Sequence, residues 1–151
     1  MPTERTALLT PEGVRLGRTA SGRADAIDQC GQALLDVGAV SAEYLPAMHE
    51  REESVSTFIG EGVAIPHGTD ASRQYVKQTS LVVLQFPDGV DWGSGNVAKL
   101  CVGIAAHGSE QVGILSSLAM ILMDPAKAAE LREAPDAETV IRLLQSIDEE
   151  N

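Results

Sequence analysis

Apolar residues recur at the spacing of an α-helix in two parts of the chain, one near its start and one near its end. The earlier helix is predicted from the apolar face Ala26, Ile27, Cys30, Ala33, Leu34 and Val37. Ser21 stands just before this face and is expected to cap the helix, since a serine oxygen accepts bonds from free helix N–H groups. A second helix is predicted over residues 42–53.

The helical spacing returns after residue 110. It is carried by Ile114, Leu115, Leu118, Ile121 and Leu122. Asp124 and Pro125 have the residue types of an N-cap and a first helical position, so they predict a short helix there. Asp136 is expected to cap a last helix, and that helix has one apolar face made of Val140, Ile141 and Leu144.

The middle of the chain lacks this spacing and is typical of β-strands. Short strands are predicted at residues 14–16, 57–59 and 63–65. Two further segments, residues 81–86 and 100–106, are almost continuously apolar. A strand of that kind needs cover on both faces of its sheet.

The order of helices, then strands, then helices predicts an α/β fold of three layers, α/β/α, in which helices flank a mixed central sheet. Pro87-Asp88-Gly89 is expected to be the turn that ends the strand at residues 81–86. No linker or repeat divides the sequence, so residues 1–151 are predicted to form a single domain.

Charge and composition narrow the possible partners. A formal net charge of −11 argues against nucleic acid and anionic membranes, because both require clustered Lys and Arg. No apolar run approaches the ~20 residues of a membrane-spanning helix, and residues 1–12 lack the apolar centre of a signal peptide. A cytoplasmic protein is therefore expected. Cys30 and Cys101 are predicted to be buried thiols, and three scattered histidines do not have metal-site spacing.

The candidate chemistry lies at the end of the predicted strand 63–65. Pro66 cannot continue the hydrogen bonding of a strand, so it places His67 at the strand exit. Gly68 is expected to let an anion approach the backbone, and Thr69 adds a hydroxyl donor. A histidine with a pKa of ~6.5 is mostly neutral at pH 7 and is a nucleophile when an acceptor holds its other nitrogen. From these residues alone, His67 is either a phosphoryl acceptor or an inert turn residue.

The surrounding sequence resembles a known family. Residues 60–69, Gly-Glu-Gly-Val-Ala-Ile-Pro-His-Gly-Thr, resemble the phosphorylation-site signature of the mannitol/fructose family of enzyme IIA domains of the bacterial sugar phosphotransferase system, and are closest to its mannitol class. Residues 47–52 match the family's Ala-Met-x-x-Arg-Glu pattern, and residues 85–90 and 103–106 are similar to its hairpin and strand. The resemblance extends over residues 14–144.

The resemblance implies that His67 takes a phosphoryl group from the carrier protein HPr and passes it to a cysteine of a IIB component, for uptake of mannitol or a related sugar. It implies that Arg51 contacts the phosphoryl group, a task that suits a forked guanidinium. It implies no cofactor and no metal. Because HPr is basic around its histidine in this family, Glu61 and Asp70 are expected to be acidic docking residues near His67. A regulatory, nitrogen-type module that acts by phosphorylation-dependent protein binding would use the same histidine, so that alternative stays open.

One position departs from the mannitol pattern. That class carries a second active-site histidine shortly after the strand that matches residues 103–106, and this chain has Gln111 there. Glutamine can donate a hydrogen bond to a phosphoryl oxygen or orient the His67 ring, but it carries no positive charge. His107 is the alternative source of a second imidazole, whereas His49 has no predicted role.

Overall fold

The computed structural model describes residues 8–107 and 110–150. Its helices are the short 3₁₀ turns η1 (Pro11–Gly13) and η2 (Asp70–Tyr75) and the α-helices α1 (Arg23–Asp36), α2 (Tyr44–Ser54), α3 (Glu110–Leu122), α4 (Pro125–Arg132) and α5 (Ala137–Glu150). Its strands are β1 (Val14–Arg15), β2 (Phe58–Gly60), β3 (Val63–Ala64), β4 (Ser80–Gly93) and β5 (Asn96–Ala105).

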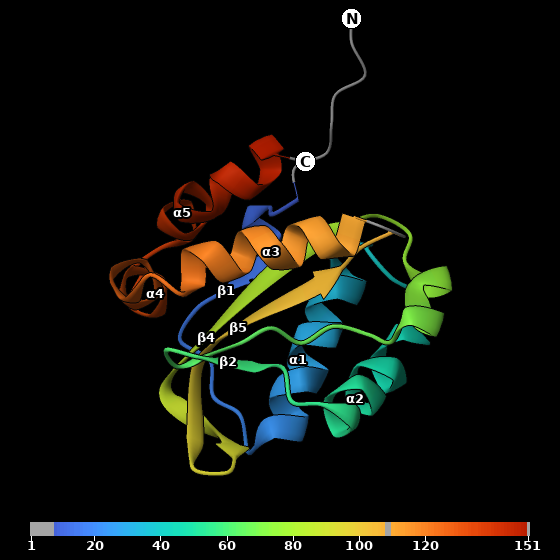
Figure 1. The fold of residues 1–151 in the computed structure, drawn as a ribbon, viewed down its shortest axis with the longest axis horizontal. Coiled ribbons are helices and arrows are strands. Elements are labelled where there is room, and N and C mark those ends of the chain that lie inside the picture. The colour runs from blue at the N-terminus through green and yellow to red at the C-terminus, as the bar shows by residue number, and fades with distance from the viewer. Residues whose placement is uncertain (1–7, 108–109, 151) are drawn as a thin grey trace, which may run out of the picture.

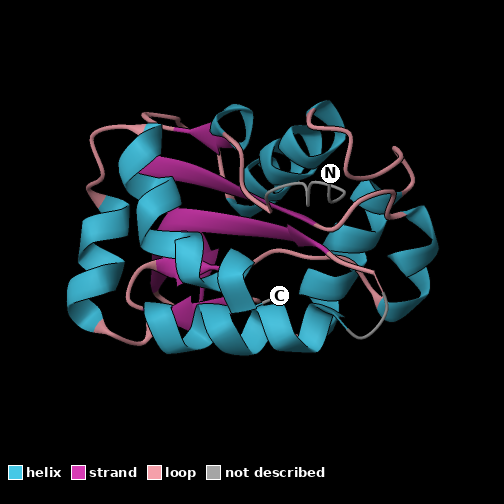
Figure 2. Ribbon diagram, turned by 90° about the horizontal axis from the view of Figure 1, so that it is seen from above, coloured by secondary structure: helices cyan, strands magenta, loops and turns pink. Residues whose placement is uncertain are grey.

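The strands form one five-stranded mixed sheet in the order β1-β4-β5-β3-β2. β4 and β5 pair antiparallel, and so do β2 and β3. β1 pairs parallel to β4, and β3 pairs parallel to β5. Helices α3, α4 and α5 lie on one side of this sheet and α1 and α2 on the other (Figure 1). Seen from above, the strands lie between helices on both sides (Figure 2). The predicted three-layer α/β/α fold with a mixed central sheet is confirmed.

The two long strands are buried on both faces, which explains their apolar sequence. In β4, Leu81 and Val83 pack into the core under α3, α4 and α5, while Val82 and Leu84 pack into the core against α1 and α2. The four side chains are at most 2 % exposed. At ~25 cal/mol per Å² of apolar surface, each such side chain contributes about 1.5–3 kcal/mol, so the two cores hold the layers together.

The strand containing residues 81–86 does not end at Pro87-Asp88-Gly89, and that prediction is wrong. β4 continues to Gly93, and Pro87-Asp88-Gly89 lies within an irregular stretch where the register with β5 shifts. Gly89 has a φ of 84°, which lets β4 bend there without breaking. The hairpin turns instead at Ser94-Gly95, where both residues have positive φ, as in the two-residue hairpin turns that match the twist of paired strands.

The predicted helix caps have mixed outcomes. Asp124 accepts a hydrogen bond from the Ala126 N–H, and Asp136 accepts one from the Thr139 N–H, as expected. Ser21 does not cap α1. Gly22 is the N-cap, without a side-chain bond, and the Ser21 N–H instead donates to Asp25 at 2.9 Å. The carboxylate of Asp25, in the first turn of α1, thus fixes the backbone that leads into the helix and does not cap its free N–H groups.

Within the part of the chain that the structure describes, no single helix has the length and hydropathy to span a bilayer. Only α3 and α4 taken together would pass that criterion, and they meet at a bend of 95°.

Candidate active site

His67 lies at the exit of the β3 segment, alongside the last residues of β5. The Ile104 N–H donates to the Pro66 carbonyl at 3.0 Å, and His67 pairs with Ile104 in an isolated parallel bridge. The imidazole Nδ1 is 2.8 Å from the Ile65 carbonyl oxygen. Because that oxygen can only accept, Nδ1 carries the proton and Nε2 holds a free lone pair. His67 is thus prepared as a nucleophile at Nε2.

Burial lowers the pKa of His67 below its ordinary value, since only 4 % of the residue is exposed. The positive charge of Arg51 acts in the same direction. The hydrogen bond to Ile65 and the carboxylates of Glu52 and Asp70 oppose the shift without cancelling it. His67 is therefore neutral at pH 7, which is the protonation state a nucleophile needs.

An NMR titration of His67 will show its midpoint below pH 6.5, its ordinary value. As the pH falls through 6.5, the unfolded chain takes up this proton before the folded chain does, so His67 lowers the free energy of unfolding in acid. Denaturant melts between pH 7.5 and 5.5, compared with a His67→Gln variant, measure this contribution. A wild-type midpoint at or above pH 6.5 would contradict the burial argument.

The backbone after His67 is held by Tyr44 of α2. The Tyr44 hydroxyl, 1 % exposed as a residue, accepts from the Gly68 N–H at 2.8 Å and donates to the Ile104 carbonyl at 2.9 Å. Burial raises the pKa of this hydroxyl, so it keeps its proton. A Cβ on Gly68 would lie 2.6 Å from Tyr44 Cε1 and 2.3 Å from Ser72 Oγ. Gly68 is required by this packing, and its N–H is occupied by the Tyr44 hydroxyl. The approach of an anion to the backbone at this position stays a prediction.

The end of α2 lies beside His67 and carries two charged residues. Arg51 is half-buried, and its Nη1 donates to the Val55 carbonyl at 2.6 Å. This bond fixes the position of the guanidinium group, and the positive charge of that group lowers the pKa of His67. Glu52 is 6 % exposed and accepts from Thr57 and Trp92. The sequence comparison matched Glu52 as part of the Arg-Glu pair but assigned it no role.

The two candidates for the second-histidine position are placed differently. Gln111 lies in the first turn of α3, 8 % exposed, just beyond the end of β5 that carries Ile104. No hydrogen bond joins it to His67 in the structure of residues 8–107 and 110–144. The His107 ring lies 3.3 Å from the Lys77 carbonyl, next to the start of β4. The His107 N–H also donates to the Thr79 hydroxyl at 3.1 Å, so His107 contacts the segment that leads into β4.

The acidic residues expected near His67 are separated by the fold. Asp70 follows His67 closely, is exposed, and pairs with Arg73 at 3.0 Å. Glu61 lies in the β2–β3 turn, next to Lys99, whose N–H donates to the Gly62 carbonyl. Lys99 and Ile104 are five residues apart along β5, about 17 Å at ~3.3 Å per residue. The expectation that Glu61 lies near His67 is wrong.

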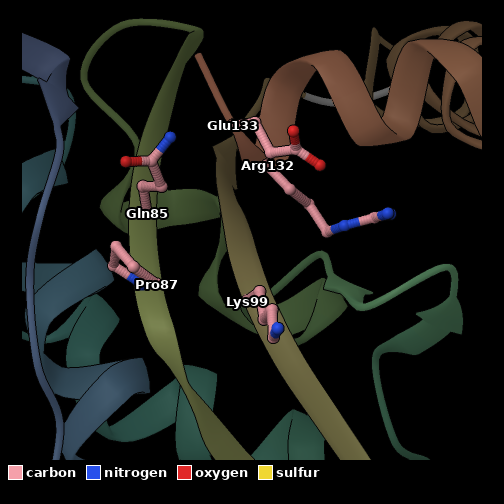
Figure 3. Close-up of a pocket in the computed structure, with 5 residues that line it drawn as sticks. All are labelled: Gln85, Pro87, Lys99, Arg132 and Glu133. Carbon is pink, nitrogen blue, oxygen red and sulfur yellow. The ribbon is translucent and has the colours of Figure 1, made fainter. Parts of the chain in front are cut away.

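The remote end of the sheet holds a separate cavity, shown in Figure 3. It has a volume of about 380 Å³ and is lined by Gln85, Pro87, Lys99, Arg132 and Glu133. The guanidinium of Arg132 donates to the Glu61 carbonyl, and Gln85 donates to the Ala134 carbonyl at 3.1 Å. These polar groups secure the β2–β3 turn and the end of α4. None of the predicted site residues reaches this cavity.

Other reactive side chains lie outside the site. Cys30 and Cys101 are fully buried, as predicted. Hydrogen bonding with Cys30 and burial raise the pKa of the Cys101 thiol well above its ordinary value, so it stays protonated. His49 bonds to Asp28 at 2.6 Å, and so joins α2 to α1. Among the described residues, no group of three or more His, Cys, Asp or Glu side chains could hold a metal ion.

An α/β domain that presents a neutral histidine, held at Nδ1 and flanked by an arginine, has the features of a phosphocarrier. A family model described as "Phosphoenolpyruvate-dependent sugar phosphotransferase system, EIIA 2" matches residues 7–147. The chain belongs to this family, and is a phosphotransferase component of that system.

Relatives of known name support a particular branch of the family. The mannitol-specific phosphotransferase enzyme IIA component of Bacillus subtilis is 37 % identical over 140 residues, which are 93 % of this chain and 98 % of that protein. The crystal structure of IIA mannitol from Escherichia coli superposes with a TM-score of 0.83 at 35 % identity, covering 89 % and 97 % of the two chains. A complex of enzyme IIA and phosphorylated enzyme IIB of the E. coli mannitol system gives a TM-score of 0.85 at 34 % identity, covering 92 % and 99 %.

Proposed function

We propose that this chain is a mannitol-type phosphocarrier that accepts a phosphoryl group from phospho-HPr on Nε2 of His67 and passes it to a cysteine of a IIB component. The observation that carries the proposal is the 2.8 Å contact between His67 Nδ1 and the Ile65 carbonyl, which leaves Nε2 as the nucleophile. Relatives named as mannitol-specific enzyme IIA, and a relative solved in complex with phosphorylated IIB, support the sugar class and the acceptor.

The two transfer steps balance without a metal or cofactor. In the first, the Nε2 lone pair of His67 forms a bond to phosphorus, and the donor's P–N bond breaks with its electron pair returning to the donor imidazole. The positive charge that develops on the His67 ring is stabilised by the Nδ1–H···O=C bond to Ile65. In the second, a thiolate of IIB attacks phosphorus, and the P–Nε2 bond breaks to restore the neutral ring.

Arg51 is proposed to hold the phosphoryl oxygens, and Gln111 to support them or the ring. Arg51→Ala will slow transfer from phospho-HPr by about a hundredfold, as expected for loss of one charge-assisted donor. Arg51→Lys will recover only part of the rate, since an ammonium cannot form a forked pair. Gln111→Ala will slow transfer by roughly tenfold or less, as for a neutral bond. Single-turnover kinetics measures all three.

Arg142→Ala, on α5 across the sheet from α2, is the matched control and should leave the rate unchanged. A wild-type rate in Arg51→Ala would remove this arginine from the mechanism.

The direct test of the proposed function is incubation with enzyme I, HPr and labelled phosphoenolpyruvate, followed by addition of a mannitol IIB component. We expect the label to appear on this chain and then to move to IIB. A ³¹P spectrum should assign it to Nε2 of a phosphohistidine. Label that enters the chain but never reaches IIB would favour the regulatory alternative, and no label at all would reject both.

We also propose that residues 1–151 work as one domain in the cytoplasm, where HPr would meet it. The continuous sheet, with both faces covered by helices, supports the single domain. The charge of −11 supports a basic docking partner such as HPr, and Asp70 is the exposed acidic residue near His67.

A further inference from the structure

A buried carboxylate lies behind the candidate site. Glu52 is 6 % exposed, and its two oxygens accept from the Thr57 N–H at 3.0 Å, from the Thr57 hydroxyl, and from the Trp92 indole N–H at 3.0 Å. No ion pair to Glu52 is present among the described residues. Burying a carboxylate costs folding free energy unless hydrogen-bond donors surround it. The presence of a glutamate at this buried position therefore indicates a specific role.

Hydrogen bonds connect Glu52 to His67 without interruption. Glu52 holds the N–H of Thr57, the Thr57 carbonyl accepts from the Ile65 N–H at 3.0 Å, and the Ile65 carbonyl holds His67 Nδ1 at 2.8 Å. Each intermediate residue is thus bound on both its N–H and its C=O. This series of hydrogen bonds fixes the carbonyl that selects the His67 tautomer. Trp92 of β4 binds the same carboxylate but is not part of the series.

We propose that Glu52 is a positioning residue for His67, which sets the orientation and tautomer of the imidazole through Thr57 and Ile65. This proposal rests on the proposed function for its effect on transfer, but its effect on the ring itself is independent of that function. Glu52 adjoins Arg51 in sequence, so the same anchor also fixes the end of α2 from which Arg51 acts. The Glu52 carboxylate therefore fixes the positions of both His67 and Arg51 relative to each other.

Glu52→Gln and Glu52→Ala separate geometry from charge. A glutamine Oε1 can accept from the Thr57 and Trp92 N–H groups, while its NH₂ donates to the Thr57 hydroxyl, which rotates to accept. The hydrogen-bond chain is then kept and the charge is lost. Alanine leaves three buried donors without an acceptor, and frees the segment that carries the Ile65 carbonyl.

We expect ¹⁵N NMR of the wild type to show one His67 tautomer, protonated at Nδ1. Glu52→Gln should retain it and transfer within about threefold of the wild-type rate. Glu52→Ala should show both tautomers and lose about a hundredfold in transfer, as for a misplaced reacting group. The chain's single tryptophan, Trp92, reports by its fluorescence whether the end of α2 is still docked in these variants.

Two controls isolate the positioning role. Glu50→Gln makes the same chemical change on the exposed face of α2 and should change nothing. Trp92→Phe removes a hydrogen bond to Glu52 that is not part of the series leading to His67. This variant should lower the melting temperature but keep the tautomer and the transfer rate. This variant also tests the proposal if Glu52→Ala fails to fold, because loss of the single tautomer or of the rate in Trp92→Phe would indicate a general structural role.

The proposal is overturned if folded Glu52→Ala keeps the single Nδ1–H tautomer, or if Glu52→Gln loses as much rate as Glu52→Ala. Failure of the proposed function gives a different result. In that case the wild type takes no label from phospho-HPr, while the tautomer change in Glu52→Ala is still observed.

Discussion

Replacing His67 by alanine will abolish phosphoryl acceptance by this chain. Nε2 of His67 is the atom proposed to form the bond to phosphorus, and the other two histidines are committed elsewhere: His49 bonds to Asp28, and His107 lies against the Lys77 carbonyl. Neither can take over the transfer. The measurement is labelling by enzyme I, HPr and labelled phosphoenolpyruvate, with a detection limit at least a thousandfold below the wild-type signal, the order expected when a nucleophile is removed.

Loss of labelling must be separated from loss of folding, because His67 is 4 % exposed and its removal leaves a small cavity. His67→Gln is the matched variant: it fills much of the same volume and retains a donor toward the Ile65 carbonyl, but has no imidazole. Both variants should show a cooperative melt and take no label. Labelling of either folded variant would falsify the assignment of the acceptor.

Replacing Gly68 by alanine will damage both stability and transfer. The added methyl group would lie 2.6 Å from Cε1 and 2.8 Å from Cζ of Tyr44, closer than any relaxed contact. The ring must move, and its hydroxyl then loses the Gly68 N–H and the Ile104 carbonyl. We expect a destabilisation of about 1–3 kcal/mol, typical of overpacking, and about a hundredfold slower transfer because the segment carrying His67 shifts. Denaturant melts and single-turnover kinetics measure the two effects.

Two variants show whether the ring contact is the cause. Gly22→Ala adds a methyl group where no atom lies within 4 Å, and should change stability by less than about 1 kcal/mol and transfer not at all. Tyr44→Phe keeps the ring but removes the hydroxyl, so it should reproduce part of the Gly68→Ala effect. If Gly68→Ala transfers as fast as the wild type, the Tyr44 contact does not position the site.

Most of the architecture could be predicted from the sequence because it follows from local periodicity. The apolar face of residues 26–34 lies in the core against the sheet, and the strand at residues 81–86 is buried on both faces. The end of that strand could not be predicted this way. Pro87-Asp88-Gly89 has the composition of a turn, but cross-strand pairing with β5 resumes after it and carries β4 on to Gly93. Tertiary pairing overrode the local signal.

The candidate site could be predicted where single residues carry its motif, and not where it depends on contacts across the fold. His67 and Arg51 are candidates from their motifs, and the positive charge of Arg51 acts to lower the pKa of His67. The roles of Tyr44 and Glu52 depend on partners 24 and 40 residues away, Gly68 and Trp92. No local pattern encodes such distances. Gly68 shows the same limit: its small size is evident in the sequence, but its reason, an aromatic ring from another helix, is not.

The β4–β5 hairpin also has a consequence for the order in which the molecule folds. Its two strands are joined by two residues, so they can pair after closing a very short loop. By contrast, His67 must find Ile104 across 37 residues, and Val14 of β1 must find Val83 of β4 across 69 residues. Closing a short loop costs less conformational entropy than closing a long one, so we expect the hairpin to form first and the histidine segment to dock on it later. The part of this protein that would perform chemistry is thus assembled on a finished scaffold.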